Sequence, residues 1–326
     1  MMQPYPWQAD QWQFWLNQQG RYGHAYLLSG ASGLGLPDFA AWMAKSLFCS
    51  GEHKPCGQCH GCTQFDHQQH ADYFELQIAE GKKEIGIDQV RQLTQDLMQT
   101  AHQGGFKVAV LHQVELLNTS AFNALLKTLE EPPMGTVLIL TTHQISRLPA
   151  TIISRCLKMD FTAPTLDISQ AWLAQQAEQF DEKLVKRALR LNWGAPLDAY
   201  QWLQNQGWEQ DQAWQQDLQA LSSGQKSVNQ VVGEWLKWEQ PEQVFNQFYW
   251  LSVSRIRRAF YQQQDGWNPQ WFQFQQQVLQ AKQDWYQNAN KELVLESLCL
   301  LSLQLQQGRE GLPNVFASPW IRGKWA

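Results

Sequence analysis

The sequence lacks any long apolar run and any excess of basic residues. No stretch of its 326 residues approaches the roughly 18 consecutive apolar residues of a membrane helix. The first residues, MMQPYPWQADQWQ, have neither the basic region nor the apolar core of a secretory signal. The formal net charge is −5, so no overall basic field would drive tight, independent binding to nucleic acid. These absences predict a cytoplasmic protein that shares any DNA contact with partners.

The length and the cysteine content set further expectations. A chain of 326 residues is longer than one hydrophobic core usually grows, so two or three domains are expected. Hydrophobic residues make up 44% of the chain, which is enough to fill such cores. Disulfides are rare in a reducing compartment, so the six cysteines point to metal binding instead.

The stretch 26–47 has the outline of a phosphate-binding strand, loop and helix. The motif G-x-x-x-x-G-K-S/T uses its lysine to hold the outer phosphates and its hydroxyl to bind magnesium. Here Leu36 replaces the lysine and Pro37 replaces the hydroxyl residue. The glycines are kept at Gly30, Gly33 and Gly35. We expect weak or no nucleotide binding, at most through backbone amides. The alternative interpretation is a chance glycine-rich turn.

A cluster of four cysteines follows this helix. The four are Cys49, Cys56, Cys59 and Cys62. Glycines at 57 and 61 allow tight turns that bring the sulfurs together, and four thiolates at this spacing suit a closed, tetrahedral structural zinc site. An iron–sulfur cluster is the alternative, although the C-x3-C-P that should follow in the ferredoxin pattern is absent. A nearby histidine could also replace one thiolate.

The segments after the cysteines alternate between strands and helices. Strands are expected at 72–78, 106–111 and 136–142, and helices from 87 and over 119–133, which is the pattern of a parallel α/β sheet. His112 and Gln113 end the second of these strands, where nucleotidases of this class carry the carboxylates that hold magnesium and activate water. Both halves of the hydrolytic apparatus are therefore missing.

An aromatic stripe occurs near the N-terminus. Trp7, Trp12 and Trp15 recur at helical spacing over 7–19, which predicts an amphipathic helix packed on the first domain. A stacking platform for nucleic-acid bases is the alternative.

Two longer segments carry a family resemblance. FKVAVLHQVELLNTSAFNALLKTLEEPP, at 106–133, and TVLILTTHQISRLPATIISRC, at 136–156, resemble the AAA+ ATPases of bacterial clamp loaders, as does the four-cysteine insertion. The resemblance is good over the first half of the chain and thins out beyond it. The ATPase subunits gamma or tau should have the intact lysine and acidic pair, so this chain resembles the catalytically degenerate members.

The resemblance implies a three-domain architecture. Residues 1–163 would form a RecA-like AAA+ domain with a parallel sheet and the zinc module at 49–62. Residues 164–207 would form a small helical lid, in which Leu197 replaces a nucleotide-sensing arginine. Residues 208–326 would form an all-helical oligomerisation collar.

The resemblance also implies a function and partners. Arg155, between Ser154 and Cys156, would act in trans as an arginine finger on a neighbour's nucleotide. The partners would be the subunits gamma or tau and delta, and indirectly the sliding clamp and primed DNA. We therefore expect a non-hydrolysing clamp-loader subunit of a DNA-directed DNA polymerase holoenzyme, with Zn²⁺ and without ATP or Mg²⁺ at its own site. The alternatives are an active gamma- or tau-like ATPase and a zinc-dependent nucleic-acid-binding module.

Overall fold

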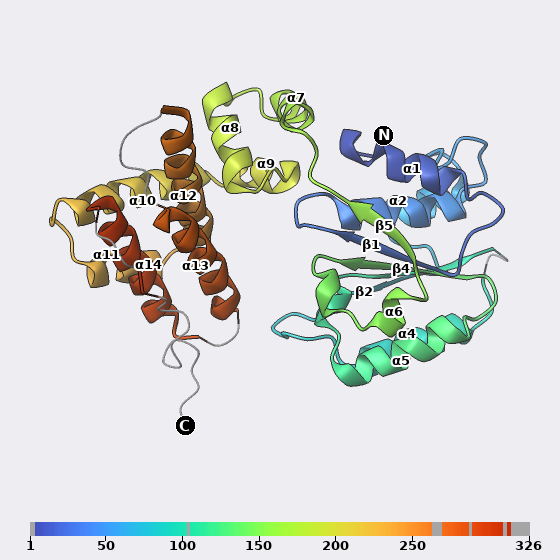
Figure 1. The fold of residues 1–326 in the computed structure, drawn as a ribbon. Helices are drawn as coiled ribbons and strands as arrows, with labels where there is room; N and C mark the ends of the chain where they lie inside the picture. Colours follow the sequence, from blue (N-terminus) through green and yellow to red (C-terminus); the bar gives the residue numbers. More distant parts are fainter. Residues whose placement is uncertain (1–3, 103–104, 263–268, 287–288, 309–311, 314–326) are drawn as a thin grey trace. The chain divides into compact units, whose positions relative to one another are not determined.

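The computed structural model describes residues 4–102, 105–262, 269–286, 289–308 and 312–313 (Figure 1). The chain forms two compact units. The first comprises Met1–Glu178 and Gly194–Ala199, and the second comprises Gln179–Trp193 and Tyr200–Ala326. Within the described residues, no helix has the length and apolarity needed to cross a bilayer.

A five-stranded parallel sheet forms the centre of the first unit. Its order is β2-β3-β4-β1-β5, so β2 and β5 are the edge strands. The strands are β1 (Ala25–Gly30), β2 (Tyr73–Leu76), β3 (Lys107–Leu111), β4 (Thr136–Thr142) and β5 (Leu157–Phe161). The three central strands are apolar and almost wholly buried, as expected when helices cover both faces. All carboxyl ends meet at one edge, where ligands bind in such sheets.

Helices cover both faces of this sheet (Figure 1). α1 (Ala9–Leu16) and α2 (Leu36–Phe48) lie on one face, and α4 (Ile87–Met98) and α5 (Thr119–Glu130) lie on the other. Each face has its own apolar core. The remaining elements are η1 (Pro6–Gln8), α3 (His60–Asp66), η2 (Val114–Leu116), η3 (Ile145–Arg147), α6 (Ala150–Ile153) and α7 (Leu166–Gln176).

The tryptophans near the N-terminus pack on the first unit. Trp12 and Trp15 are buried against α2, and the Trp15 indole N–H donates to the Ser46 hydroxyl at 2.8 Å. Trp7 stacks on Tyr5 at a ring-centroid distance of 4.9 Å. The interpretation as a packed amphipathic helix is therefore confirmed for 9–16. Because Trp12 and Trp15 are buried, they offer no exposed platform on which bases could stack.

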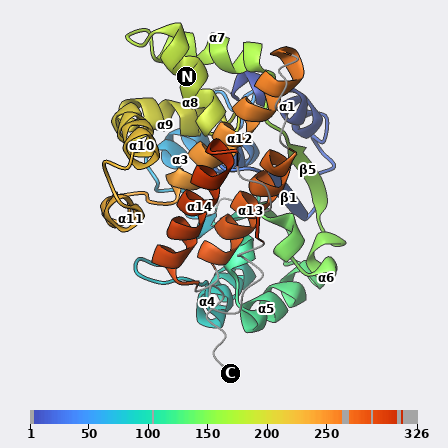
Figure 2. The ribbon, with the colours of Figure 1, turned by 60° about the vertical axis from the view of Figure 1, so that its left-hand side comes forward.

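The described elements that begin in the second unit are all helices (Figure 2). They are α8 (Glu182–Leu191), α10 (Gly207–Ser222), α11 (Val228–Trp235), α12 (Gln243–Gln262), α13 (Gln270–Trp285) and α14 (Lys291–Gln306). α9 (Pro196–Gln204) begins in the first unit and continues into the second. An apolar core rich in Trp and Phe holds α10 to α14 together.

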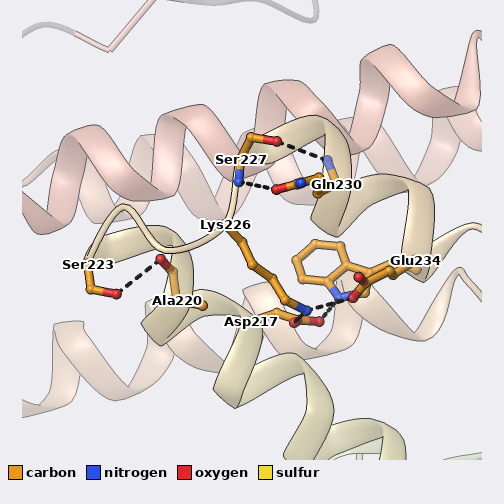
Figure 3. Close-up of polar contacts among 8 residues, drawn as sticks. Asp217, Ala220, Ser223, Lys226, Ser227, Gln230 and Glu234 are labelled. Atoms are coloured by element: carbon orange, nitrogen blue, oxygen red, sulfur yellow. Dashed lines mark hydrogen bonds and ion pairs between the residues drawn. The ribbon is translucent and has the colours of Figure 1, made fainter.

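A buried carboxylate joins α10 to α11 (Figure 3). Asp217 accepts from Lys226 Nζ at 2.8 Å and from the indole N–H of Trp235, also at 2.8 Å. Lys226 contacts the exposed Glu234 as well, at 2.7 Å. The hydrogen bond to Asp217 is the leading cause that raises the pKa of Lys226 to about 12. Ser227 and Gln230 form a capping box at the start of α11.

The expected parallel α/β unit, followed by a helical region, is confirmed. Of the expected strands, 136–142 agrees residue for residue with β4, whereas β2 is shorter than the expected 72–78. The strand β5 was not expected. A separate lid at 164–207 and a collar at 208–326 remain predictions.

Candidate functional site

The phosphate-binding outline is present in the backbone. β1 ends at Gly30 and α2 begins at Leu36, so the loop lies at the carboxyl edge of the sheet. Gly33 and Gly35 have φ of +72° and +79°, the left-handed region that side chains with a Cβ rarely adopt. The loop is thus a strand-to-helix turn, which favours the phosphate-loop interpretation over a chance glycine-rich turn.

The side chains that would bind nucleotide are absent from this loop. Leu36 is fully buried in the core beneath the loop, where the motif would place an amine. Pro37, in the first turn of α2, offers neither an N–H nor a hydroxyl. The loop therefore has no positive side chain to hold outer phosphates, and position 37 offers no hydroxyl ligand for magnesium.

The N-terminal segment covers one end of the loop. A Cβ on Gly35 would lie 2.6 Å from the Tyr5 ring and 3.0 Å from Nε2 of Gln8. The Gln8 amide is buried and donates to the carbonyls of Leu34 at 2.8 Å and of Gly35 at 3.0 Å. The Tyr5 hydroxyl donates to Asp38 at 3.0 Å, and burial followed by the Asp38 charge raises the pKa of Tyr5.

A carboxylate from α9 covers the other part of the loop. A Cβ on Gly33 would lie only 2.4 Å from Cγ of Asp198, so the carboxylate rests on the glycine α-carbon. The Ser32 hydroxyl donates to Asp198 at 3.4 Å, and the N–H of Leu197 donates to the Gly33 carbonyl at 3.1 Å. Burial raises the pKa of Asp198, although the Ser32 bond and the charge of His143 oppose that shift.

The end of β3 carries no acidic pair. His112 Nε2 lies 2.7 Å from the Glu75 carboxylate on β2, and the N–H of Gln113 donates to the Thr141 hydroxyl at 3.1 Å. Glu115 accepts from the N–H of His143 at 3.0 Å. These contacts tie strand ends together, and no carboxylate stands at 112 or 113 to bind magnesium or activate water.

The four cysteine sulfurs converge at the end of α2. All four lie within 4.8 Å of one another, and the sulfurs of Cys49 and Cys59 are 3.9 Å apart. Sulfurs bound to one zinc at about 2.3 Å would be about 3.8 Å apart at the corners of a tetrahedron. The cysteines are therefore placed to bind one metal ion.

Backbone amides aim at this cluster. The N–H groups of Gly51 and Cys56 donate to the sulfur of Cys49 at 3.3 and 3.2 Å, and the N–H of Cys59 donates to Cys56 at 3.3 Å. Burial raises the pKa of Cys62 to about 12. Burial acts in the same sense on Cys59, but amide hydrogen bonds prevail and lower its pKa to about 5. Such N–H···S bonds favour thiolates, the form that binds metal.

Arg155 lies away from the loop, in the turn between α6 and β5. Its guanidinium donates to the Thr151 carbonyl at 3.0 Å and to the Glu130 carboxylate at 2.6 Å. The side chains of Arg155 and Glu130 are 35% and 49% exposed, so a partner could reach them. Ser154 also bonds to the Thr151 carbonyl, whereas burial raises the pKa of Cys156 to about 12.

The structure brings together part of what the sequence predicted. The three glycines form one loop and the four thiols form one cluster, while the roles of Ser154, Arg155 and Cys156 remain predictions. Asp198, Tyr5 and Gln8 were not predicted to touch the loop, nor was Glu130 predicted to hold Arg155. The only sequence signal for Asp198 was its position beside Leu197.

Comparison with known proteins places the first half of the chain. The family model described as "DNA polymerase III, delta subunit" matches residues 8–165. The DNA polymerase III subunit delta' of Pseudomonas aeruginosa is 41% identical over 205 residues, which cover 62% of each chain. The Escherichia coli delta' is 36% identical over 199 residues, or 60% of this chain and 59% of that protein.

The relatives named as tau subunits match less of the chain. The Escherichia coli DNA polymerase III subunit tau is 38% identical over 153 residues, which are 46% of this chain and 23% of tau. The matches to delta' span about three fifths of those relatives' own length, 62% and 59%. Residues 8–165 thus match the model of the DNA polymerase III delta subunit family, and the proteins similar to the chain in sequence include delta' subunits.

Proposed function

We propose that this chain is a non-hydrolysing subunit of the bacterial DNA polymerase III clamp loader. It would complete a ring with the ATPase subunits gamma or tau and with delta, and help that ring place the sliding clamp on primed DNA. The observation that carries the proposal is the phosphate loop, which keeps its backbone while Leu36 is buried in the lysine's place. The similarity to delta' subunits supports the same assignment.

An active ATPase is the competing function, and the loop argues against it. Hydrolysis needs charge stabilisation around the transferring phosphoryl group, which lysine, magnesium and a carboxylate normally supply. The residues at those positions here are apolar or neutral, Leu36, Pro37 and Gln113, together with His112, whose ring contacts the Glu75 carboxylate. We therefore expect no turnover by the isolated chain.

Within the proposed ring, the chemistry of this chain would act on a neighbour. Arg155 is partly exposed, and Thr151 and Glu130 engage one nitrogen each of its guanidinium. A guanidinium has five N–H donors, so the others can reach a phosphate in a bidentate manner. In this position Arg155 would stabilise charge on a phosphoryl group bound by the next subunit.

We propose that the cysteine cluster holds a structural Zn²⁺. Four thiolates around one ion would complete a tetrahedral site and leave no coordination position for substrate, and the closeness of the four sulfurs supports this. The ion would tie the 49–62 segment to the end of α2. The residues that would bind it are Cys49, Cys56, Cys59 and Cys62.

The proposed assembly and the proposed inactivity are tested together. The full chain is mixed with gamma or tau and with delta, and the mixture is resolved by size-exclusion chromatography with light scattering. We expect one stable hetero-oligomer, and no ATP turnover by the chain alone. A chain that remains monomeric with all these partners would contradict the clamp-loader role, and turnover that co-purifies with the chain would contradict the inactive loop.

A further inference from the structure

A short segment far along the chain belongs to the same compact unit as the phosphate loop. Gly194–Ala199 clusters with Met1–Glu178, whereas the residues on both sides of it cluster with the second unit. Ala195 is buried in the core that also contains Leu34 and Leu36 of the loop. Apolar packing therefore holds this segment against the loop, in addition to the polar contacts described next.

Directed contacts then fix the register of this docking. The N–H of Leu197 donates to the Gly33 carbonyl at 3.1 Å, and the Ser32 hydroxyl donates to Asp198 at 3.4 Å. Both contacts fall on the central residues of the loop. In a working loop the backbone N–H groups of the loop cradle the phosphates of the nucleotide.

The Asp198 carboxylate occupies the space over the loop. A Cβ built on Gly33 would lie 2.4 Å from its carboxyl carbon and 2.6 and 2.8 Å from its two oxygens. Real Cβ atoms do not approach other atoms this closely, so the carboxylate fills the space that a side chain at residue 33 would need. A bound phosphate and this carboxylate could not share that volume.

The Asp198 carboxylate is surrounded by groups of the loop and of the neighbouring strand end. His143, which follows β4 and acts on Asp198, has its Nδ1 3.0 Å from the Gly30 carbonyl at the start of the loop. Burial raises the pKa of Asp198, so the carboxylate is partly withdrawn from water. One acidic side chain thus contacts the loop and faces the strand end beside it.

We infer that Asp198 stands in the place of a nucleotide phosphate, so that Gly194–Ala199 stays docked on the loop without nucleotide. The loop would then serve as an intramolecular clasp for the first turn of α9. The proposed function requires only that hydrolysis be absent, and it does not require the loop to be filled. The clasp is a property of the isolated chain. Its test can therefore give a negative result while the proposed clamp-loader role is correct, and the clamp-loader role can be wrong while the clasp is present.

Hydrogen–deuterium exchange on the full chain tests the clasp. Asp198→Ala should raise exchange about tenfold in peptides that cover 30–36 and 194–199, because these segments then open locally. Peptides that cover 107–111 and 136–142 should stay protected. Asp167→Ala is the matched control, since Asp167 is an exposed aspartate in the first turn of α7. Equal exchange in the Asp198 and Asp167 variants would overturn the inference.

Pyrophosphate then tests whether a phosphate can bind where the Asp198 carboxylate lies. Millimolar pyrophosphate should leave exchange of the wild type unchanged but restore protection to 30–36 in Asp198→Ala. Asp198→Asn, which keeps the side-chain volume over Gly33, should behave like the wild type. Protection of the wild type by pyrophosphate, or none in the alanine variant, would overturn the claim that Asp198 replaces a phosphate. Asp198→Ser suits the first turn of a helix and provides the same opening if the alanine variant does not fold.

Discussion

Arg155 and Glu130 form an ion pair of 2.6 Å that joins the turn after α6 to the last residue of α5. A second bond, from the Arg155 guanidinium to the Thr151 carbonyl, holds the same group at 3.0 Å. Because two different nitrogens make these bonds, the plane of the guanidinium is fixed and not merely its position. The proposed arginine finger is therefore oriented before any partner binds.

Glu130→Gln should weaken this orientation with little effect on folding. Exposed ion pairs contribute about 0 to 1 kcal/mol, so urea unfolding should shift by less than about 1 kcal/mol. In a complex with ATPase partners, stimulated ATP hydrolysis should fall, but by less than about tenfold, since about 1.4 kcal/mol corresponds to a factor of ten. Glu131→Gln, at the exposed neighbouring glutamate, is the control. Equal rates in the two variants would show that Glu130 does not position Arg155.

The metal site makes a prediction about content. Purified protein should contain about one zinc per chain, because four thiolates complete a tetrahedral site. Cys59→Ser should lose most of the metal, and Cys156→Ser should retain it. Acidification should release zinc as protons compete for the thiolates. Elemental analysis of the three proteins decides, and unchanged zinc in Cys59→Ser would contradict the four-thiol site.

Leu36→Lys with Pro37→Thr would restore the sequence of the phosphate-binding motif, but we expect it not to restore ATP hydrolysis. Leu36 is fully buried, so its replacement should destabilise the first unit by about 2 to 5 kcal/mol. ATP turnover should stay absent, since no acidic pair stands at 112 and 113. Leu300→Lys, at a 52% exposed position of α14, should cost less than about 0.5 kcal/mol in the same urea titration. Turnover by the double variant would show that the lysine and the hydroxyl alone were limiting.

Asp217→Ala should destabilise the second unit. It leaves the buried indole N–H of Trp235 without its partner, which costs about 1 to 3 kcal/mol. Glu234→Ala removes the exposed partner of Lys226 and should cost less than about 1 kcal/mol. Urea unfolding followed by tryptophan fluorescence compares the two. Equal losses would mean that the Trp235 bond contributes little.

The sequence was informative where chemistry and short-range pattern coincide. The glycine spacing predicted the loop, and the cysteine spacing predicted a cluster whose sulfurs do converge. The apolar run 136–142 predicted β4 to the residue, because a strand buried on both faces reads as a continuous apolar segment. The His112 and Gln113 substitutions were visible because they directly follow such a strand.

Features that depend on distant packing were not predictable. β5 is an edge strand in which Leu157 and Lys158 are exposed and Met159 and Phe161 are buried, so it lacks the apolar run of the central strands. Asp198 reaches Gly33 only because the chain returns to the loop after α8, which no local periodicity encodes. The pairing of Glu130 with Arg155 likewise requires the α5–α6 geometry.

The measurement that tests the central proposal most directly is ATP hydrolysis by a reconstituted complex that contains Arg155→Ala. The exposed Arg147→Ala, in η3 of the same unit, is the matched control. Loss of a dominant arginine finger costs about 10³ to 10⁵ in rate, and the whole complex should lose less because this chain would serve only one of several sites. We predict normal assembly with both variants, and reduced DNA- and clamp-stimulated hydrolysis and clamp loading with Arg155→Ala alone. Unchanged hydrolysis and loading in a fully assembled Arg155→Ala complex would contradict the account.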